Sequence, residues 1–455
     1  MYSLEKIVNY CKQTGFVYQG SEIYNGLANT WDYGPLGALL KNNIKKLWIK
    51  HFCSESKLNC LIDTGILMNQ KVWEASGHLA NFSDPLTECK VCNVRYRADN
   101  LISNALDVEI ENLSNADLDN ILISGKIKCP NCQSSNFSTI KSFNMMFQTF
   151  QGVSLDSANK IFLRPETAQG IFINFKNILR TTRKKIPFGV CQVGKSFRNE
   201  ITPGNFIFRT REFEQMELEF FCKPNTELEW FNYWKNEMDI FLQKLGIPSH
   251  LLKDYEHPKE VLSHYSNKTT DILFQFPWGF EELWGIASRT NFDLLAHEGA
   301  SGVSLKYQDP ETNGFYTPYV VEPSVGVERL FLALISCSLT TEELPNNETR
   351  EVLKIVPALA PYKACILPLI KKEHSVYANI LFDNLSKHFE CTYDETQAIG
   401  KRYRRQDQIG TPFCITVDHQ SLIDDTVTIR HRDTMEQVRV SKDEITNFVK
   451  INTKF

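Results

Sequence analysis

Apolar and polar residues alternate along two runs of the chain, 190–197 and 208–221, and this alternation predicts a pair of β-strands. A Pro-Gly-Asn sequence at 203–205 separates them, so we expect an antiparallel hairpin with a long loop. Side chains alternate between the two faces of a strand, so the register can be read directly. The apolar side chains that define the core face of the second strand are Met216, Leu218 and Phe220.

The opposite face of the second strand is polar. Its members are Arg209, Arg211, Phe213, Gln215, Glu217 and Glu219, and Arg198 and Glu200 fall together on the first strand. A face with arginines, an aromatic ring and carboxylates is costly to bury unless its charges have partners. The pattern therefore predicts the floor of a binding site for something anionic, planar and partly cationic.

Apolar residues at helical spacing predict three helices outside the hairpin, at 3–14, 37–52 and 226–246. The third has an apolar stripe that indicates packing rather than function. Its members are Leu228, Phe231, Trp234, Met238, Phe241, Leu242 and Leu245. The helix at 37–52 suits either a core position or a dimer interface, and the sequence leaves both open.

Two Cys-x2-Cys pairs lie 36 residues apart in the sequence, inside a segment at 86–143 that reads as an insertion. The four thiols are Cys89, Cys92, Cys129 and Cys132. Four thiolates in two such pairs suit tetrahedral Zn²⁺ in a closed structural site. Chance pairs or a redox dithiol are the alternatives, and zinc is the favoured interpretation.

The C-terminal part of the chain changes pattern. Short apolar runs alternate with helices over 361–455, which predicts a small separate α/β domain. The polar residues before it favour a linker, which we place at 346–360. A basic run in this domain surrounds a tyrosine and is a candidate for contacts with nucleic-acid phosphates. Its cations are Lys401, Arg402, Arg404 and Arg405.

Composition adds limits rather than an activity. At 455 residues, 42% hydrophobic and 23% charged, the chain is long enough for two or three folded domains, and its net charge of −4 excludes no class of partner. No apolar run approaches the roughly 20 residues of a membrane span, and the N-terminus lacks a signal-peptide core. Thirteen cysteines, an odd number, favour reduced thiols and a cytoplasmic location.

Residues 189–196 match the phosphate-loop pattern G-x4-G-K-S, which alone would indicate a nucleoside triphosphatase. That motif requires a flexible loop followed by a helix. Here the interior residues Val190, Cys191 and Val193 favour a strand, and no helix start follows Ser196. We therefore interpret the match as coincidence and the segment as the first strand of the hairpin.

Two segments resemble signature motifs of the class II aminoacyl-tRNA synthetases. Residues 197–200 (Phe-Arg-Asn-Glu) with 208–215 resemble motif 2, and 322–329 (Glu-Pro-Ser-Val-Gly-Val-Glu-Arg) resemble motif 3. The sequence contains neither HIGH nor KMSKS, the signatures of class I enzymes, so class I has no support. Further segments at 31–35, 164–170, 282–289 and 400–407 are similar to the glycyl-tRNA synthetase family, so the resemblance covers nearly the whole chain.

This resemblance implies an α+β fold: an antiparallel catalytic sheet flanked by helices, with a zinc-knuckle insertion and a C-terminal α/β anticodon-binding domain. The catalytic domain would occupy 1–85, with motif 1, and 144–345, and the anticodon-binding domain 361–455. The family's single-chain type is a homodimer. It activates glycine with ATP, giving glycyl-adenylate and pyrophosphate, and transfers the glycyl group to the 3′-terminal adenosine of tRNA(Gly).

The resemblance also assigns residues to ATP. Arg198 and Arg329 would be catalytic; Arg198 would hold the α-phosphate, because a guanidinium group can bind two oxygens at once. Glu282 would be the acidic contact for Mg²⁺. The ATP-binding residues implied are Arg198, Asn199, Glu200, Phe208, Arg209, Phe213, Glu282, Leu283, Gly326 and Arg329.

Glycine has no side chain to bind, so its ammonium, carboxylate and small size must be recognised. The glycine-binding residues implied by the family are Arg97, Glu166, Glu217, Arg289, Glu322 and Ser324. Three neighbouring carboxylates repel one another, and a bound cation would help to keep them ionised. A related module that had lost catalysis would show gaps among these residues, and the sequence shows none.

Overall fold

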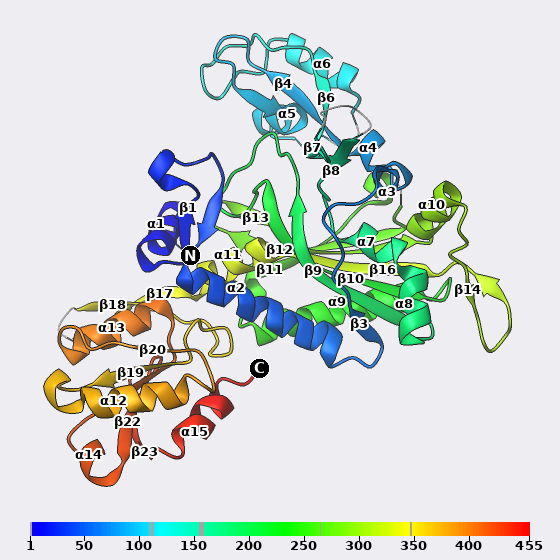
Figure 1. Ribbon diagram of the computed structural model, residues 1–455. Helices are drawn as coiled ribbons and strands as arrows, with labels where there is room; N and C mark the ends of the chain where they lie inside the picture. The colour runs from blue at the N-terminus through cyan, green and yellow to red at the C-terminus, as the bar shows by residue number, and fades with distance from the viewer. Residues whose placement is uncertain (1, 109, 111–112, 154–158, 264, 346–347) are drawn as a thin grey trace.

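A seven-stranded sheet lies at the centre of this computed structural model, which describes residues 2–455 except 109, 111, 112, 154–158, 264, 346 and 347. An insertion projects from one end, cyan at the top of Figure 1, and the C-terminal domain, orange and red, lies at the lower left. The bounds of the seven strands, in spatial order, are β11 Leu252–Glu256, β12 Lys268–Phe276, β13 Gly279–Thr290, β16 Tyr319–Gly326, β10 Glu212–Cys222, β9 Phe188–Phe197 and β3 Asn59–Leu61.

The predicted hairpin is the centre of this sheet. Strands β9 and β10 pair antiparallel from Glu212 opposite Phe197 to Phe221 opposite Phe188. Among the described residues of this sheet, β3 and β9 are the only neighbouring strands that run parallel. Residues 189–196 lie within β9, so the strand interpretation is confirmed and the phosphate-loop one is not. Arg209 and Arg211 precede β10 and belong to the loop rather than to the strand face.

One face of the sheet packs against helices in the main core. Met216, Leu218 and Phe220 are fully buried there, as the alternation predicts. An aromatic group joins the elements: Phe52 lies 5.4 Å from Trp284, ring centroid to ring centroid, and Phe241 lies 5.8 Å from Trp284. The helices are α2 Pro35–Trp48, the π-helix η2 Ile49–Ser54, α9 Glu227–Lys244 and α11 Val327–Ser338. Leu228 of the predicted stripe is 49% exposed, so it lies outside this packing.

The other face of the sheet is divided in two. At one end Phe188, Val190, Phe221 and Val320 form a second apolar core with three helices. These are α7 Ala168–Ile173, α8 Phe175–Thr182 and α10 Phe292–Ser301. Toward the start of β10 the side chains on this face become polar. Glu219, Glu217 and Gln215 precede Phe221 at alternate positions and therefore share its face. The helices therefore leave a polar stretch of sheet beside an apolar one.

The insertion has a sheet and a core of its own. Its strands are ordered β5 Arg95–Arg97, β4 Ser83–Glu88 and β6 Lys141–Asn144, with helices α5 Ala98–Leu106 and α6 Asn115–Ile123. Ala98, Leu101, Ile102 and Leu118 are among the side chains buried between them. The elements that connect it to the main sheet are α3 Gln70–Ala75, α4 His78–Asn81, β7 Gln148–Phe150 and β8 Lys160–Phe162.

The segment expected to be a polar linker contains structure. A hairpin of β17 Leu339–Glu343 and β18 Thr349–Leu353 crosses it, and residues 346 and 347 lie outside the described residues. Val352, Leu353 and Ile355 are fully buried. Arg350 of β18 is also buried and donates to Asp407 at 2.9 Å, which ties the hairpin to the C-terminal domain. Polar residues at the hairpin tip concealed this role in the sequence.

The C-terminal domain is an α/β unit, as expected. Its five-stranded sheet is ordered β20 Cys391–Tyr393, β19 Ala364–Pro368, β21 Phe413–Val417, β22 Thr426–His431 and β23 Gln437–Ser441. Its helices are α12 Lys371–Leu385, α13 Ile399–Ile409, α14 Ser421–Asp424 and α15 Ile445–Asn452. The apolar runs identified in the sequence form strands that bury Ala364, Ile366, Ile415 and Ile429.

The N-terminal elements and the remaining short ones complete the chain. They are α1 Leu4–Thr14, β1 Val17–Gln19, η1 Glu22–Tyr24, β2 Trp31–Tyr33, η4 Ser249–Leu251, η5 Lys259–Val261, β14 Tyr307–Gln308 and β15 Phe315–Tyr316. The helices predicted at 3–14, 37–52 and 226–246 are α1, α2 with η2, and α9. Among the described residues, none of the helices combines the length and apolarity that crossing a membrane requires.

Gly37 permits a close approach of α2 to the N-terminal strand. A Cβ atom at this position would lie 1.9 Å from the backbone oxygen of Phe16, and a backbone atom cannot move aside as a side chain can. Gly299, in the exposed end of α10, is the control position. A Cβ atom added there would have no atom within 4 Å.

We expect Gly37→Ala to destabilise the protein by at least about 2 kcal/mol, because the helix must shift. Gly299→Ala should leave stability unchanged or raise it by up to about 1 kcal/mol through helix propensity. Unfolding of both variants in denaturant, followed by circular dichroism, checks the difference. Equal stabilities for the two variants would contradict the close approach.

Candidate active site

Two rows of side chains cross the polar part of the sheet. Strand register places Glu217 opposite Ser324, and Ser324 opposite Gly285. One step along, Glu322 lies opposite Ala287. The β13 positions carry little or no side chain, so the carboxylates of β10 and β16 face an open space rather than a packed neighbour.

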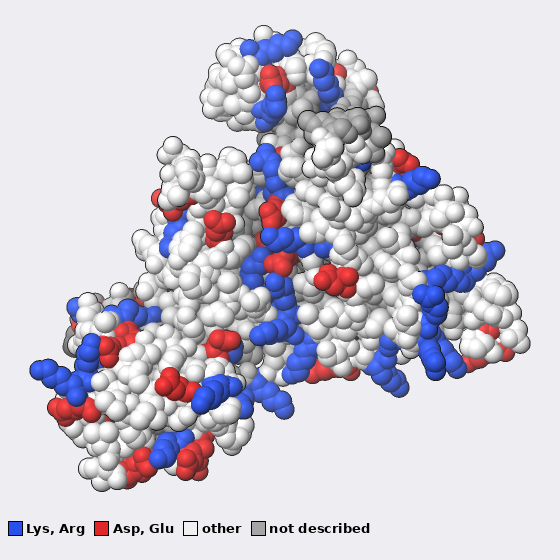
Figure 2. All heavy atoms as spheres, viewed as in Figure 1, with Lys and Arg blue, Asp and Glu red and all other residues white. Residues whose placement is uncertain are grey.

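A cavity of about 240 Å³ opens above these rows. Glu322, Ser324, Gly285 and Ala287 lie on one side of it, which contains the carboxylate of Glu322. Arginines and aromatic rings line the rest of it. Of the predicted ATP-binding residues, those lining the cavity are Arg198, Glu200, Phe208, Arg209, Phe213, Glu282, Leu283, Gly326 and Arg329. Figure 2 shows blue and red atoms side by side along a hollow at the middle of the molecule.

The arginines of the cavity are held by rings and carboxylates. The guanidinium carbon of Arg198 lies 5.3 Å from the centroid of the Phe213 ring, and its Nε donates to the Pro165 oxygen at 3.1 Å. Arg329 lies over Phe208 at 4.4 Å and donates to Glu282 at 2.8 Å. Arg329 holds the pKa of Glu282 below its usual range. The cavity therefore combines planar surfaces with cations, as the sequence predicts.

Glu217 lies behind Ser324, is buried, and is not among the residues that line the cavity. One of its oxygens accepts from the Thr167 backbone N–H at 3.0 Å, and the other accepts from the Ser324 hydroxyl at 2.8 Å. Gln215 donates to it at 2.9 Å. Burial, with the nearby Glu322 and Glu166, raises the pKa of Glu217 to about 7. Its charge near neutral pH therefore depends on the charges around it.

Arg289 neutralises part of this acidic group. Its Nη1 donates to both oxygens of Glu322, at 2.9 and 3.1 Å, and its Nε donates to Asp293 at 2.8 Å. Burial disfavours the charged form of Arg289, but Asp293 and Glu322 hold its pKa well above the usual range. Burial raises the pKa of Glu322, and Arg289 opposes that shift. Arg289 thus acts beneath the carboxylates rather than at the cavity surface.

Glu166 belongs to the same group from a different element, the turn before α7. It accepts from Gln169 at 2.9 Å and lies 3.5 Å from His78 Nε2. Burial alone would raise its pKa, but His78 and Arg289 hold the pKa of Glu166 below the usual range. The fold therefore brings Glu166, Glu217 and Glu322 together, as predicted from their family positions.

Other predicted site residues lie elsewhere. Arg97, expected on the glycine side, is in the insertion and pairs with Asp84 and Asp99. Asn199 is not among the cavity-lining residues, and its backbone N–H donates to Met145. Neither residue touches the carboxylate group in this structure.

The basic run of the C-terminal domain lies on α13 and is not uniform. Arg402 is 4% exposed and donates to the backbone oxygens of Gln397 and Pro368, so its guanidinium holds the fold. Arg404 pairs with Glu348, and Arg405 with Asp394, both at the surface. Lys401 is exposed. Three of the four predicted cations therefore remain accessible.

The sequence interpretation missed several residues of the site. Tyr265 and Thr269 line the cavity. Asp293, Gln169 and His78 support the carboxylates from behind. These residues come from a separate strand, separate helices and a loop, and no spacing rule relates them to the hairpin. Glu219 was visible as a member of the polar strand face, although it received no role.

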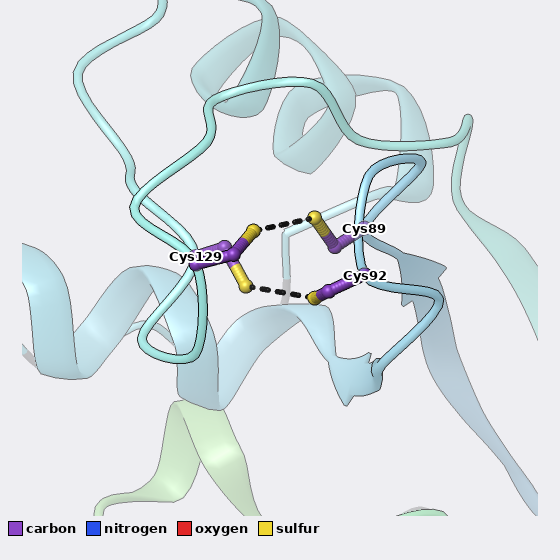
Figure 3. A group of neighbouring side chains, drawn as sticks. Cys89, Cys92 and Cys129 are labelled. Carbon is purple, nitrogen blue, oxygen red and sulfur yellow. Dashed lines mark hydrogen bonds between the residues drawn. The ribbon is translucent and has the colours of Figure 1, made fainter.

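The four predicted metal ligands meet in the insertion. Cys89 and Cys132 Sγ atoms are 3.5 Å apart, and those of Cys92 and Cys129 are 3.6 Å apart. All four sulfurs lie within 4.8 Å of one another, and Figure 3 shows Cys89 and Cys92 facing Cys129 from opposite loops. Tetrahedral zinc with bonds of about 2.3 Å places sulfurs about 3.8 Å apart, so the donor set fits Zn²⁺.

A second group of possible ligands, Glu373, His374 and His419, does not fit a metal ion. The Nδ1 atom of His374 accepts from the Ile370 N–H at 2.9 Å. A neutral imidazole that accepts at Nδ1 carries its proton on Nε2, so neither nitrogen has a lone pair left for a metal.

The raised pKa of Glu217 has a consequence for stability. Because the folded state binds this proton more tightly than the unfolded state, the contribution of Glu217 is fully present below about pH 4 and falls as the pH rises toward about 7. The variant Glu217→Gln has no carboxyl group at this position, so it does not lose this stability as the pH rises. The difference in unfolding temperature between Glu217→Gln and the wild type, measured without ligands, should therefore grow in favour of the variant from about pH 5 to about pH 8.

Glu212→Gln on the same strand is the control, because this carboxylate is about half exposed and pairs with Lys195. The difference in unfolding temperature between Glu212→Gln and the wild type should not grow in favour of the variant from about pH 5 to about pH 8. A pH-independent difference for Glu217→Gln would contradict the proposed pKa.

Comparison with known proteins identifies the family. Residues 150–338 match the model of the tRNA synthetase class II core domain (G, H, P, S and T), and residues 363–452 match that of the anticodon binding domain. The chain is similar to the glycine–tRNA ligases of Bacillus thuringiensis (55% identical, all of both chains covered), Alkaliphilus oremlandii (55%, 100% and 99%) and Geobacillus thermodenitrificans (56%, 98% and 97%). With two domain models in this order and relatives of this identity over their full lengths, the chain belongs to the glycine–tRNA ligase family of class II aminoacyl-tRNA synthetases.

Proposed function

We propose that this protein is a glycine–tRNA ligase that forms glycyl-adenylate from glycine and ATP and then transfers the glycyl group to the terminal adenosine of tRNA(Gly). The observation that carries the proposal is the continuity of two sites in one cavity. Arginines and aromatic rings suited to a nucleotide line the same cavity as the buried carboxylate Glu322, and Glu217 lies directly behind Ser324 of that cavity, so an ammonium group suits this end. The family membership supports the same reaction.

In the first step, the glycine carboxylate attacks the α-phosphate, so negative charge must be positioned and stabilised. Arg198 is the residue for that centre, since it lines the cavity with its guanidinium beside the Phe213 ring. Glu200 would accept from the adenine amino group, Phe213 would stack on the ring, and Arg209 and Arg329 would bind the outer phosphates. Mg²⁺ bound with ATP lowers the phosphate charge, and Glu282, which is ionised beside Arg329, suits such a hard cation.

Glycine would bind with its ammonium against Glu166, Glu217 and Glu322 and with Ser324 beside it. A cation there favours the ionised form of Glu217. Arg289 would hold Glu322 in place from below. Alanine must be excluded by its methyl group, which costs about 1–3 kcal/mol in a filled pocket.

We further propose that the anticodon-binding domain contacts tRNA through the exposed Lys401, Arg404 and Arg405. We also propose a homodimer formed around α2, and a cytoplasmic location, which the thirteen free cysteines support. Arg97 is proposed, from its family position, to act on the substrate side in glycine binding.

Glycine-dependent exchange of pyrophosphate into ATP tests the activity directly. Exchange with glycine but not alanine supports the proposal. Absence of exchange with glycine in purified, folded protein would indicate a class II module without catalysis, whereas hydrolysis of ATP that does not depend on glycine would indicate a nucleoside triphosphatase.

Glu322→Gln tests the ammonium site. We expect the glycine KM in the exchange assay to rise by at least about tenfold, because the variant loses a charge next to the ammonium, while the ATP KM stays within about twofold. Glu212→Gln should change neither value. An equal rise in the KM for glycine and the KM for ATP would contradict the proposed role of Glu322.

Zinc is proposed at the four cysteines of the insertion. Elemental analysis of metal-replete protein should find about one zinc per chain, and Cys129→Ser should abolish it. Loss of the metal should also expose the 86–143 segment to proteolysis, because the two loops lose their link. Cys337→Ser, outside the cluster, should retain the zinc, and zinc-free wild-type protein would reject the site.

A further inference from the structure

Glu219 is a buried carboxyl group for which the reaction described above has no use. Its side chain is fully buried in β10, and neither oxygen has a hydrogen-bond donor among the described residues. An unpartnered buried carboxylate is costly, so its presence requires an explanation.

Strand register places Glu219 directly across from Glu322. Glu217 pairs with Ser324 and Phe220 pairs with Val321, so the same register puts Glu219 opposite Glu322 on the shared polar face. Facing Cβ atoms in an antiparallel pair are about 4.5–5.5 Å apart. Each of the two carboxyl groups also shifts the pKa of the other, as groups in close proximity do. Two carboxyl groups therefore meet at the base of the carboxylate pocket.

Two buried carboxylates in contact cannot both be ionised without a large cost, so one of them keeps a proton. Arg289 decides which one, because its guanidinium donates directly to both oxygens of Glu322 and makes no such contact with Glu219. Burial, together with Glu322, raises the pKa of Glu219 well above the usual range. The proton therefore stays on Glu219, where it can be donated to Glu322.

The other charged groups around Glu219 act in the same direction or are already paired. Glu217 is its neighbour on β10 and adds negative charge. Asp293 of α10 is bound to Arg289, and Glu166 before α7 lies by His78. On the β9 side the opposing residue is Val190, which is apolar. Arg289 is the cation that opposes protonation of Glu219, and its guanidinium is engaged by Glu322 and Asp293.

We propose that Glu219 is a positioning residue of the glycine pocket: its protonated carboxyl group donates a hydrogen bond to Glu322 and fixes the Glu322 carboxylate toward the substrate ammonium. This inference rests on the proposed function. Arg289, near the end of β13, holds Glu322 from one neighbour of β16, and Glu219 of β10 holds it from the other. Two donors set the direction of the carboxylate, which one donor would leave free to rotate.

Two substitutions separate this role from simple packing. Glu219→Gln keeps a donor of similar size, so the glycine KM in pyrophosphate exchange should stay within about threefold of the wild type. Glu219→Leu keeps the volume but removes the donor, so the glycine KM should rise at least about tenfold with the ATP KM within about twofold. Glu212→Leu, on the same strand and outside the pocket, is the control and should change neither.

Stability distinguishes positioning from structure. Replacing a buried polar group by an apolar one of similar volume is often neutral or stabilising, so Glu219→Leu should unfold at or above the wild-type temperature despite its weaker glycine binding. A Leu variant with the wild-type glycine KM would overturn the positioning role. So would a Gln variant as impaired as the Leu variant.

Infrared difference spectra test the proton independently of activity. The spectrum of the ligand-free wild type minus Glu219→Gln at neutral pH should contain the carbonyl band of a protonated carboxyl group, and its absence would overturn the proposal. If the wild type shows no glycine-dependent exchange, the proposed function fails and the positioning role fails with it. The infrared band then still reports whether Glu219 carries the proton.

Discussion

The ion pairs of Arg289 are the interaction on which the site depends. Without this guanidinium, Glu322 and Asp293 would be buried side by side with no counter-charge, and Glu166 and Glu217 would add to the repulsion. With it, four acidic side chains from three strands or helices and one turn can share one enclosed space. The cost of gathering carboxylates is thus met within the protein before any substrate arrives.

The local part of this architecture follows from the sequence. Alternation in the hairpin predicts both faces of β10, since Met216 and Leu218 are buried in the core and Glu217 lies on the opposite face, where it accepts from Ser324. The cysteine spacing likewise predicts a cluster that the structure brings together. These predictions succeed because strand period and ligand spacing are properties of short segments.

The remaining features depend on contacts between distant segments. Arg402 looks like an accessible cation in the sequence, but its neighbours in space are the backbone oxygens of Gln397 and Pro368. Arg350 lies in a segment that reads as a polar linker, yet Asp407 makes it a buried anchor. Asp293 and Gln169 support the pocket from helices that no motif joins to the hairpin. Composition cannot reveal such partners, because the fold supplies them.

The small residues on β13 limit how the protein can change its amino-acid substrate. Gly285 and Ala287 already present no side chain beyond a methyl group on this wall of the cavity. A larger amino acid therefore cannot be admitted by trimming this strand. Under the proposed function, space taken from the carboxylates of β10 or β16 would remove charge that binds the ammonium. Selection for a new substrate thus meets a trade-off between room and affinity, which favours retention of glycine.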